Sequence, residues 1–156
     1  MKKAICIGIN NYPGIFNDLK GCVNDSLDWS AWLQGMGFET SIMLDSQATQ
    51  QNVKAALQDL ISTTNAGDVV VFTYSGHGTQ VSDRNSDEDD RYDEAICLYD
   101  GNVVDDDLRV ILDGIHPQAT LVVISDSCFS GSVTRLAPEP ATPRFIPPTV
   151  STAGKM

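Results

Sequence analysis

Asp68–Gly78 (DVVVFTYSGHG) joins an uninterrupted run of β-branched and aromatic residues to a short, glycine-flanked segment that contains His77. A second run of the same kind, Thr120–Gly131 (TLVVISDSCFSG), leads directly into Cys128. Runs of this length and composition predict buried strands of a parallel sheet. Because open α/β sheets bind ligands outside the carboxyl ends of their strands, we expect His77 and Cys128 to emerge side by side at that edge.

A thiol beside an imidazole is the arrangement of a nucleophile beside its general base. Free cysteine has a pKa of about 8.5, so its thiol is mostly neutral at physiological pH until a base accepts the proton. The same imidazole can later protonate a leaving amine. The glycines beside His77 allow a substrate backbone to approach closely, and the backbone N–H groups of Gly78 and Cys128 are candidates for an oxyanion hole. The pair therefore predicts a cysteine hydrolase.

The rest of the chain alternates strand-like and helix-like segments. Strands are predicted at residues 3–9, 38–44, 68–73 and 120–125, and helices at 19–36, 49–62 and 105–113. A polar, acidic loop is predicted over residues 79–94, and the turn signal at Asp100–Asn102 predicts a small hairpin between 95–99 and 103–104. Strands that alternate with helices indicate an α/β fold with a mainly parallel central sheet and right-handed crossovers.

The bulk composition limits the partners. At 156 residues, 42% of them hydrophobic, the chain fits one domain with a sizeable core. A net charge of −11 argues against nucleic acid and anionic membrane surfaces as partners, and favours cationic substrates or metal ions. No apolar run approaches the roughly 20 residues that span a bilayer, and no signal peptide is recognisable, so we expect a cytoplasmic protein.

The end of the chain differs in composition from the rest. Residues 138–156 contain five of the seven prolines. Since proline fixes φ and has no backbone N–H, we expect this segment to be an extended tail or linker rather than a core element. The folded domain is therefore predicted to cover residues 1–137.

Several short motifs, taken in order, resemble the caspase-like cysteine peptidases, specifically the metacaspase and orthocaspase branch. The motifs are Gly8–Asn10, Gly21–Asp25, Tyr74–Gly78, Tyr92–Glu94, Val104–Asp106 and Asp126–Gly131. The resemblance extends from about Lys3 to Leu136. It implies a three-layer α/β/α caspase-like fold and a p20-like catalytic domain, in which His77 is the general base and Cys128 the nucleophile of a self-processing endopeptidase.

The same resemblance implies a substrate. The family cleaves peptide bonds after Arg or Lys and binds that basic side chain with two aspartates, which correspond by motif to Asp25 and Asp126. A cationic side chain favours carboxylates in a partly dry pocket, so the chemistry agrees. The expected partner is a protein or peptide with Arg or Lys at P1, the residue before the cleaved bond.

The resemblance also implies a metal ion. Seven of the twelve residues from 83 to 94 are acidic, which indicates either a solvated loop or a segment neutralised by a hard cation. Calcium activates many metacaspases, and the corresponding ligands would be Asp93, Asp105 and Asp106. Arg135 stands where a further acidic ligand is expected, so no cofactor is required and calcium is an option. Arg135 is equally a candidate self-cleavage point.

Two alternatives to a complete peptidase stay open at this stage. The family's smaller, p10-like half adds strands to the sheet, and nothing after Leu136 resembles it. A p10-like small subunit is therefore an expected partner, and a non-catalytic regulatory or scaffold module on the same fold is the first alternative. The second is a phosphoacceptor or divalent-ion sensor, which the absence of lysine between Lys54 and Lys155 disfavours.

Overall fold

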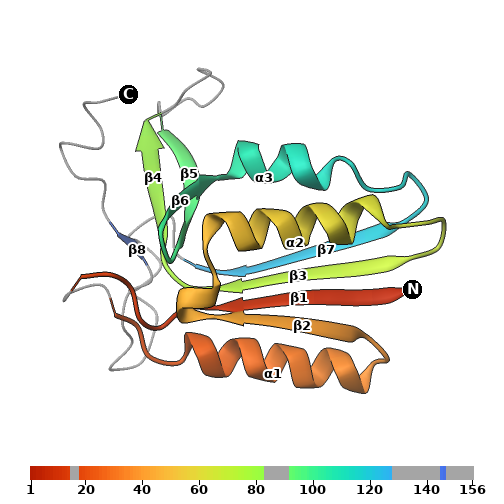
Figure 1. Ribbon diagram of the computed structural model, residues 1–156, viewed down its shortest axis with the longest axis horizontal. Coiled ribbons are helices and arrows are strands. Elements are labelled where there is room, and N and C mark those ends of the chain that lie inside the picture. The colour runs from red at the N-terminus through yellow and green to blue at the C-terminus, as the bar shows by residue number, and fades with distance from the viewer. Residues whose placement is uncertain (15–17, 83–91, 128–144, 147–156) are drawn as a thin grey trace.

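The computed structural model describes residues 1–14, 18–82, 92–127 and 145–146 of the chain. Its first sheet has the order β2-β1-β3-β7, and all neighbouring strands in it are parallel. The four strands are β1 (Lys2–Gly8), β2 (Glu39–Leu44), β3 (Val69–Ser75) and β7 (Thr120–Asp126). Figure 1 shows their carboxyl ends at the left. The predicted α/β fold with a mainly parallel central sheet is confirmed.

Helices cover both faces of this sheet (Figure 1). They are α1 (Cys22–Gly35), α2 (Gln50–Ser62) and α3 (Asp105–Leu112), and a single 3-10 turn, η1, spans Asp45–Gln47. Alternate residues of β1 enter two different clusters: Ile5 and Ile7 pack with residues of α2 and α3, whereas Ala4 and Cys6 pack with Leu33 of α1. Burial on both faces explains why β1 and β3 read as continuous apolar runs, whereas β7, predicted as a buried strand, is for the most part exposed.

A second, smaller sheet lies beyond the carboxyl ends of the first (Figure 1). Its order is β6-β5-β4-β8, and its strands are β4 (Gly78–Ser82), β5 (Tyr92–Leu98), β6 (Gly101–Val104) and β8 (Phe145–Ile146). The antiparallel pair β5–β6 confirms the predicted hairpin.

One prediction about this region was wrong. Residues 78–82 and 92–94 belong to strands β4 and β5, although a loop was predicted over 79–94. Polar and acidic side chains conceal the alternation there, in which Val81 packs with Ala95 and Val104. Two residues of the proline-rich segment, Phe145–Ile146, pair with β4, so the segment expected to be an extended tail or linker contains a short strand.

The helix boundaries follow from local chemistry. Gly21 has φ +96°, a left-handed conformation that favours glycine, so α1 begins at Cys22 rather than at residue 19. Thr49 caps α2 by accepting a hydrogen bond from the Asn52 backbone N–H at 3.2 Å. Asp105 is the first residue of α3, as predicted. Among the described residues, none of the helices is both apolar enough and long enough to cross a membrane.

Gly8 fixes how closely α1 approaches the sheet. A Cβ atom at this position would lie 2.5 Å from the carbonyl oxygen of Cys22 and 2.7 Å from Cβ of Ser26. Only glycine therefore allows the first turns of α1 to pack directly on the end of β1. This contact places the first turn of α1, with Asp25, at the carboxyl edge of the sheet.

Replacing Gly8 with alanine is expected to lower the free energy of unfolding by about 1–3 kcal/mol. The added methyl group would clash with the backbone of α1, which cannot move aside as a flexible side chain could. Urea denaturation followed by circular dichroism measures the change. Gly35→Ala is the matched control: a Cβ atom at that position would have nothing within 4 Å, so its stability should be unchanged or slightly higher. Equal stability of the two variants would contradict the packing argument.

Candidate active site

His77 lies between β3 and β4, immediately beyond the carboxyl end of β3, and is 5% exposed. In the pairing of β3 with β7, Ser75 is opposite Asp126. His77 follows Ser75 by two residues, and Cys128 follows Asp126 by two residues. Cys128 itself lies outside the described residues. The structure therefore brings the chain that leads to each member of the predicted pair to adjacent positions at one edge of the sheet.

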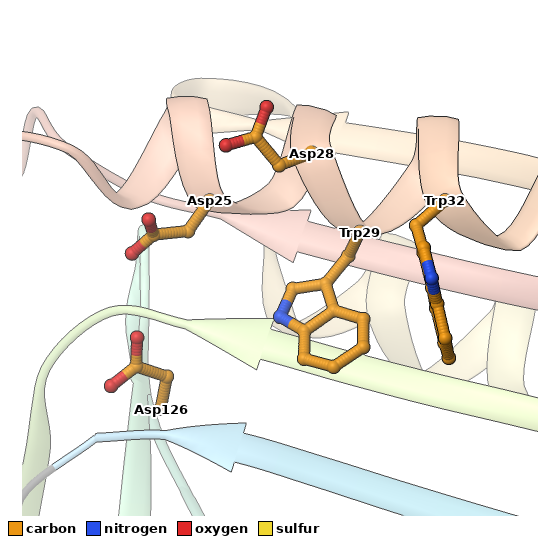
Figure 2. Close-up of a pocket in the computed structure, with 5 residues that line it drawn as sticks. All are labelled: Asp25, Asp28, Trp29, Trp32 and Asp126. Carbon is orange, nitrogen blue, oxygen red and sulfur yellow. The ribbon is translucent and has the colours of Figure 1, made fainter.

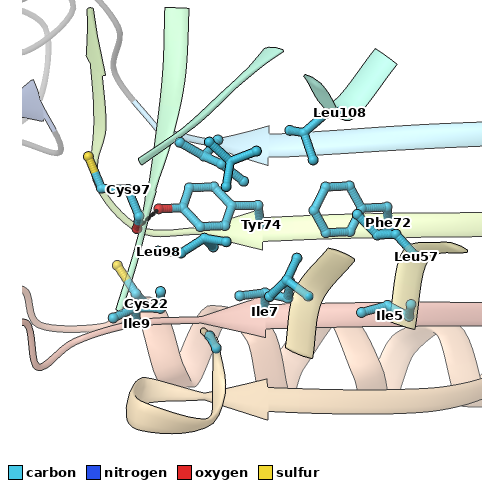
Figure 3. Close-up of a cluster of buried hydrophobic side chains, with 14 of the residues drawn as sticks. Ile5, Ile7, Ile9, Cys22, Leu57, Phe72, Tyr74, Cys97, Leu98 and Leu108 are labelled. Atoms are coloured by element: carbon cyan, nitrogen blue, oxygen red, sulfur yellow. Dashed lines mark hydrogen bonds between the residues drawn. The ribbon is translucent and has the colours of Figure 1, made fainter. Parts of the chain in front are cut away.

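Two buried tyrosines hold the backbone of His77. Its N–H donates to the Tyr12 hydroxyl at 2.9 Å, and its carbonyl oxygen accepts from the Tyr74 hydroxyl at 2.6 Å. The Tyr12 ring also packs against the imidazole, with ring centroids 4.9 Å apart. The carbonyl oxygen of Cys97 is within 2.9 Å and 2.7 Å of the two tyrosine hydroxyls, and Figure 3 shows its hydrogen bond with Tyr74. His77 is thus positioned by groups on three separate segments.

Burial keeps these groups protonated. It raises the pKa of both Tyr12 and Tyr74 well above the ordinary value for tyrosine, so neither hydroxyl ionises at physiological pH. Burial also raises the pKa of the Cys97 thiol to about 12, and that of Cys6 in the same direction. These two cysteines are therefore not nucleophiles at neutral pH.

Packing against neighbouring side chains explains why residue 76 is glycine. A Cβ atom there would lie 2.5 Å from the Tyr74 hydroxyl oxygen and 2.6 Å from that of Tyr12. The sequence interpretation assigned the glycines around His77 to close approach of a substrate. For Gly76, the structure shows that close packing against the two tyrosines already requires glycine.

A pocket of about 400 Å³ opens at the same edge of the sheet. It is lined by Asp25, Asp28, Trp29, Trp32 and Asp126. Figure 2 shows the carboxylates of Asp25, from the first turn of α1, and Asp126, from the end of β7, directed toward one another. The two residues predicted to bind a basic side chain, although 101 positions apart, therefore face the same cavity.

The comparisons with known proteins agree with this arrangement. The family model described as metacaspase, peptidase C14 domain, matches residues 2–137. The chain belongs to the metacaspase family. It is 39% identical to Metacaspase-4 of Arabidopsis thaliana over 149 residues, and 39% identical to Metacaspase-1A of Aspergillus terreus over 150 residues. These matches cover 88% and 86% of this chain, but 35% and 37% of the relatives, so the chain spans about a third of their length.

A solved structure has the same fold. The crystal structure of a protein from Geobacter sulfurreducens matches with a TM-score of 0.81 and 33% sequence identity, covering 94% of this chain and 58% of that one. Together with the metacaspase family match, this confirms the caspase-like α/β fold that the motifs implied.

Three residues of the metacaspase pocket were not predicted as site residues: Asp28, Trp29 and Trp32. Trp29 is partly buried, and Trp32 is 57% exposed. The signal was present in the spacing, because residues at i, i+3, i+4 and i+7 from Asp25 lie on one helix face. A face that combines carboxylates with indoles fits a pocket for cations better than a core contact.

The predicted calcium ligands lie on β5 and at the start of α3. Asp93 is buried in β5, whereas Asp105 and Asp106 lie in the first turn of α3, 3.5 Å and 3.6 Å from nitrogens of Arg109. In the part of the metacaspase domain that the structure describes, no group of three or more His, Cys, Asp or Glu side chains is arranged to hold a metal ion. Binding of calcium by these residues stays a prediction. Residues 83–91 and Arg135 lie outside the described residues.

The oxyanion-hole prediction concerns two backbone N–H groups. Gly78 is the first residue of β4, opposite Ile96 of β5 and Phe145 of β8. Its partner in the prediction, Cys128, lies outside the described residues, so the role of both groups stays a prediction.

Proposed function

We propose that this metacaspase domain is the catalytic part of a cysteine endopeptidase that cleaves peptide bonds after Arg or Lys. The observation that carries the proposal is the pairing of Ser75 with Asp126, because it directs the segments leading to His77 and Cys128 to one edge of the sheet. A pocket with two facing carboxylates opens at that same edge.

In the proposed reaction, His77 takes the proton of the Cys128 thiol as the sulfur attacks the scissile carbonyl carbon. The carbonyl oxygen becomes an oxyanion, for which the N–H groups of Gly78 and Cys128 are the proposed donors. When the intermediate collapses, the C–N bond breaks and the protonated imidazole gives its proton to the leaving amine. Water, deprotonated by the same imidazole, then hydrolyses the thioester and restores the thiol.

The pocket accounts for the proposed specificity. Asp25 and Asp126 approach from different elements, so a guanidinium or ammonium group between them meets carboxylate oxygens on two sides. Asp126 also precedes the proposed nucleophile by two residues, so the pocket for the substrate side chain lies close to the proposed cleavage site.

Turnover of a fluorogenic peptide with Arg at P1 tests the function directly. The purified chain should hydrolyse it, leave the same peptide with Asp at P1 intact, and lose activity after alkylation of its reactive thiol. Parallel assays with calcium and with a chelator decide the metal requirement, and the intact mass of the product reports self-cleavage. An intact fold without hydrolysis of any basic-P1 peptide would instead favour a regulatory or scaffold module.

Asp25→Asn is expected to reduce kcat/KM for the arginyl peptide by roughly 10- to 100-fold, since it removes one charged acceptor from a partly exposed pocket. Alkylation of Cys128 by a small neutral reagent should proceed at an unchanged rate, because the dyad is not altered. Asp59→Asn, on α2, changes the net charge equally and should leave kcat/KM intact. A similar loss in both variants would attribute the effect to long-range charge rather than to the pocket.

The proposed enzyme needs a partner for β7. In the described residues β7 pairs with β3 alone, and Val122 and Val123 are 40% and 49% exposed. An unpaired strand edge with apolar side chains on both faces favours addition of another strand. A p10-like small subunit is the proposed occupant.

A further inference from the structure

The acidic pocket has an aromatic side that the proposed catalytic function does not use. Trp29 and Trp32 line it together with the carboxylates, and their ring centroids are 5.6 Å apart at an interplanar angle of 80°. In Figure 2 the Trp29 indole lies beside the facing carboxylates with its ring nitrogen on their side, and Trp32 lies beyond it. The cavity therefore continues from the charged groups along the aromatic surface of α1.

The two tryptophans are not equivalent. Trp29 is partly buried and packs against the cluster on the α1 face of the sheet, which includes Leu33 and Phe38. Trp32 is 57% exposed. A ring held by packing is pre-organised for a ligand, so binding does not incur the entropy cost of ordering that ring. Trp29 is accordingly the indole that can define the shape of the pocket.

We propose that Trp29 forms an aromatic wall of the basic-residue pocket and makes it select arginine over lysine. This inference rests on the proposed function and names the preferred substrate within it. The guanidinium of arginine is planar and weakly hydrated, stacks on aromatic faces, and presents a fork of N–H donors to carboxylates on two sides. The ammonium of lysine is compact and strongly hydrated, so an indole wall stabilises it less in the same place.

The first test is the ratio of kcat/KM for two peptides that differ only in Arg or Lys at P1. Trp29→Leu should lower this ratio by roughly 3- to 30-fold relative to the unaltered chain, whereas Trp32→Leu should change it by less than about twofold. Because both peptides are assayed on one sample, loss of folded protein cancels in the ratio. An unchanged ratio in Trp29→Leu, with turnover retained, would overturn the proposal.

The second test does not require catalysis, and so separates failure of this inference from failure of the proposed function. The chain has two tryptophans, so Trp32→Phe leaves Trp29 as the sole indole reporter. Titration with n-butylguanidine should change its fluorescence saturably, with a dissociation constant at least roughly threefold lower than that for n-pentylamine. Asp126→Asn in the same background should weaken both. Equal affinities for the two probes, or no saturable change, would refute the role of Trp29 even in an inactive protein.

Discussion

Alanine in place of Cys128 is expected to reduce hydrolysis of an arginyl peptide by on the order of 10⁴- to 10⁶-fold. The methyl group cannot form the thioester, and the remaining groups only bind and polarise the peptide. The measurement is single-turnover hydrolysis at high enzyme concentration, combined with the intact mass of protein treated with a thiol-directed arginyl probe. The unaltered chain should gain one probe, and Cys128→Ala none.

Cys97→Ala is the matched control for this prediction. Burial raises the pKa of the Cys97 thiol to about 12, so it is not ionised at neutral pH, and its contact with the tyrosines is made by a backbone oxygen that alanine keeps. The control should still be labelled once by the probe and should hydrolyse the peptide. Hydrolysis that survives in Cys128→Ala at an undiminished rate would end the cysteine-peptidase proposal.

Glutamine in place of His77 is expected to lower kcat by on the order of 10²- to 10⁴-fold, the usual contribution of a general acid–base group. The backbone that Tyr12 and Tyr74 hold is unchanged, so the fold should persist. Because the variant must rely on thiolate formed without a base, its rate should keep rising between about pH 7 and 9. A pH profile of kcat therefore distinguishes loss of the base from a purely structural defect.

The second histidine of the chain provides the control, since the sequence contains only two. His116 precedes a proline in a loop, and its ring nitrogen Nδ1 accepts a hydrogen bond from the Gln118 backbone N–H at 3.1 Å. His116→Gln should keep both the rate and the pH profile of the unaltered chain. Equal losses in the two variants would remove His77 from its proposed role.

The fold was predictable where burial on two faces leaves long apolar runs. Strands β1 and β3 were found from such runs, because both of their faces pack against helices. Strand β7 was found from a run of the same composition, although most of its residues are exposed. Strand β4 was missed, since Gln80 and its charged surroundings conceal the short alternation of Thr79 and Val81. Strand β8 was missed because two residues within a proline-rich segment give no periodicity.

The reactive and charged residues of the site were predictable from the sequence, but the residues that hold them in place were not. His77, Asp25 and Asp126 stand out because their residue types imply reactions or charge. The packing of α1 on the sheet brings Asp25 and Trp29 into one pocket with Asp126. Tyr12 gave no such signal, as it lies in a turn-rich loop 65 residues from His77 and acts through a hydroxyl contact with its backbone. Contacts of that kind depend on tertiary packing, which local sequence patterns do not contain.

The tyrosine clamp, formed by the Tyr12 and Tyr74 hydroxyls on the backbone of His77, has a consequence for how the pH dependence of the proposed peptidase should be interpreted. Both hydroxyls stay neutral far above the range in which peptidases work, so the scaffold around the imidazole does not change its ionisation when acid or alkali is added. Inflections in a rate profile between about pH 6 and 9 therefore do not come from the two hydroxyl groups that hold the His77 backbone.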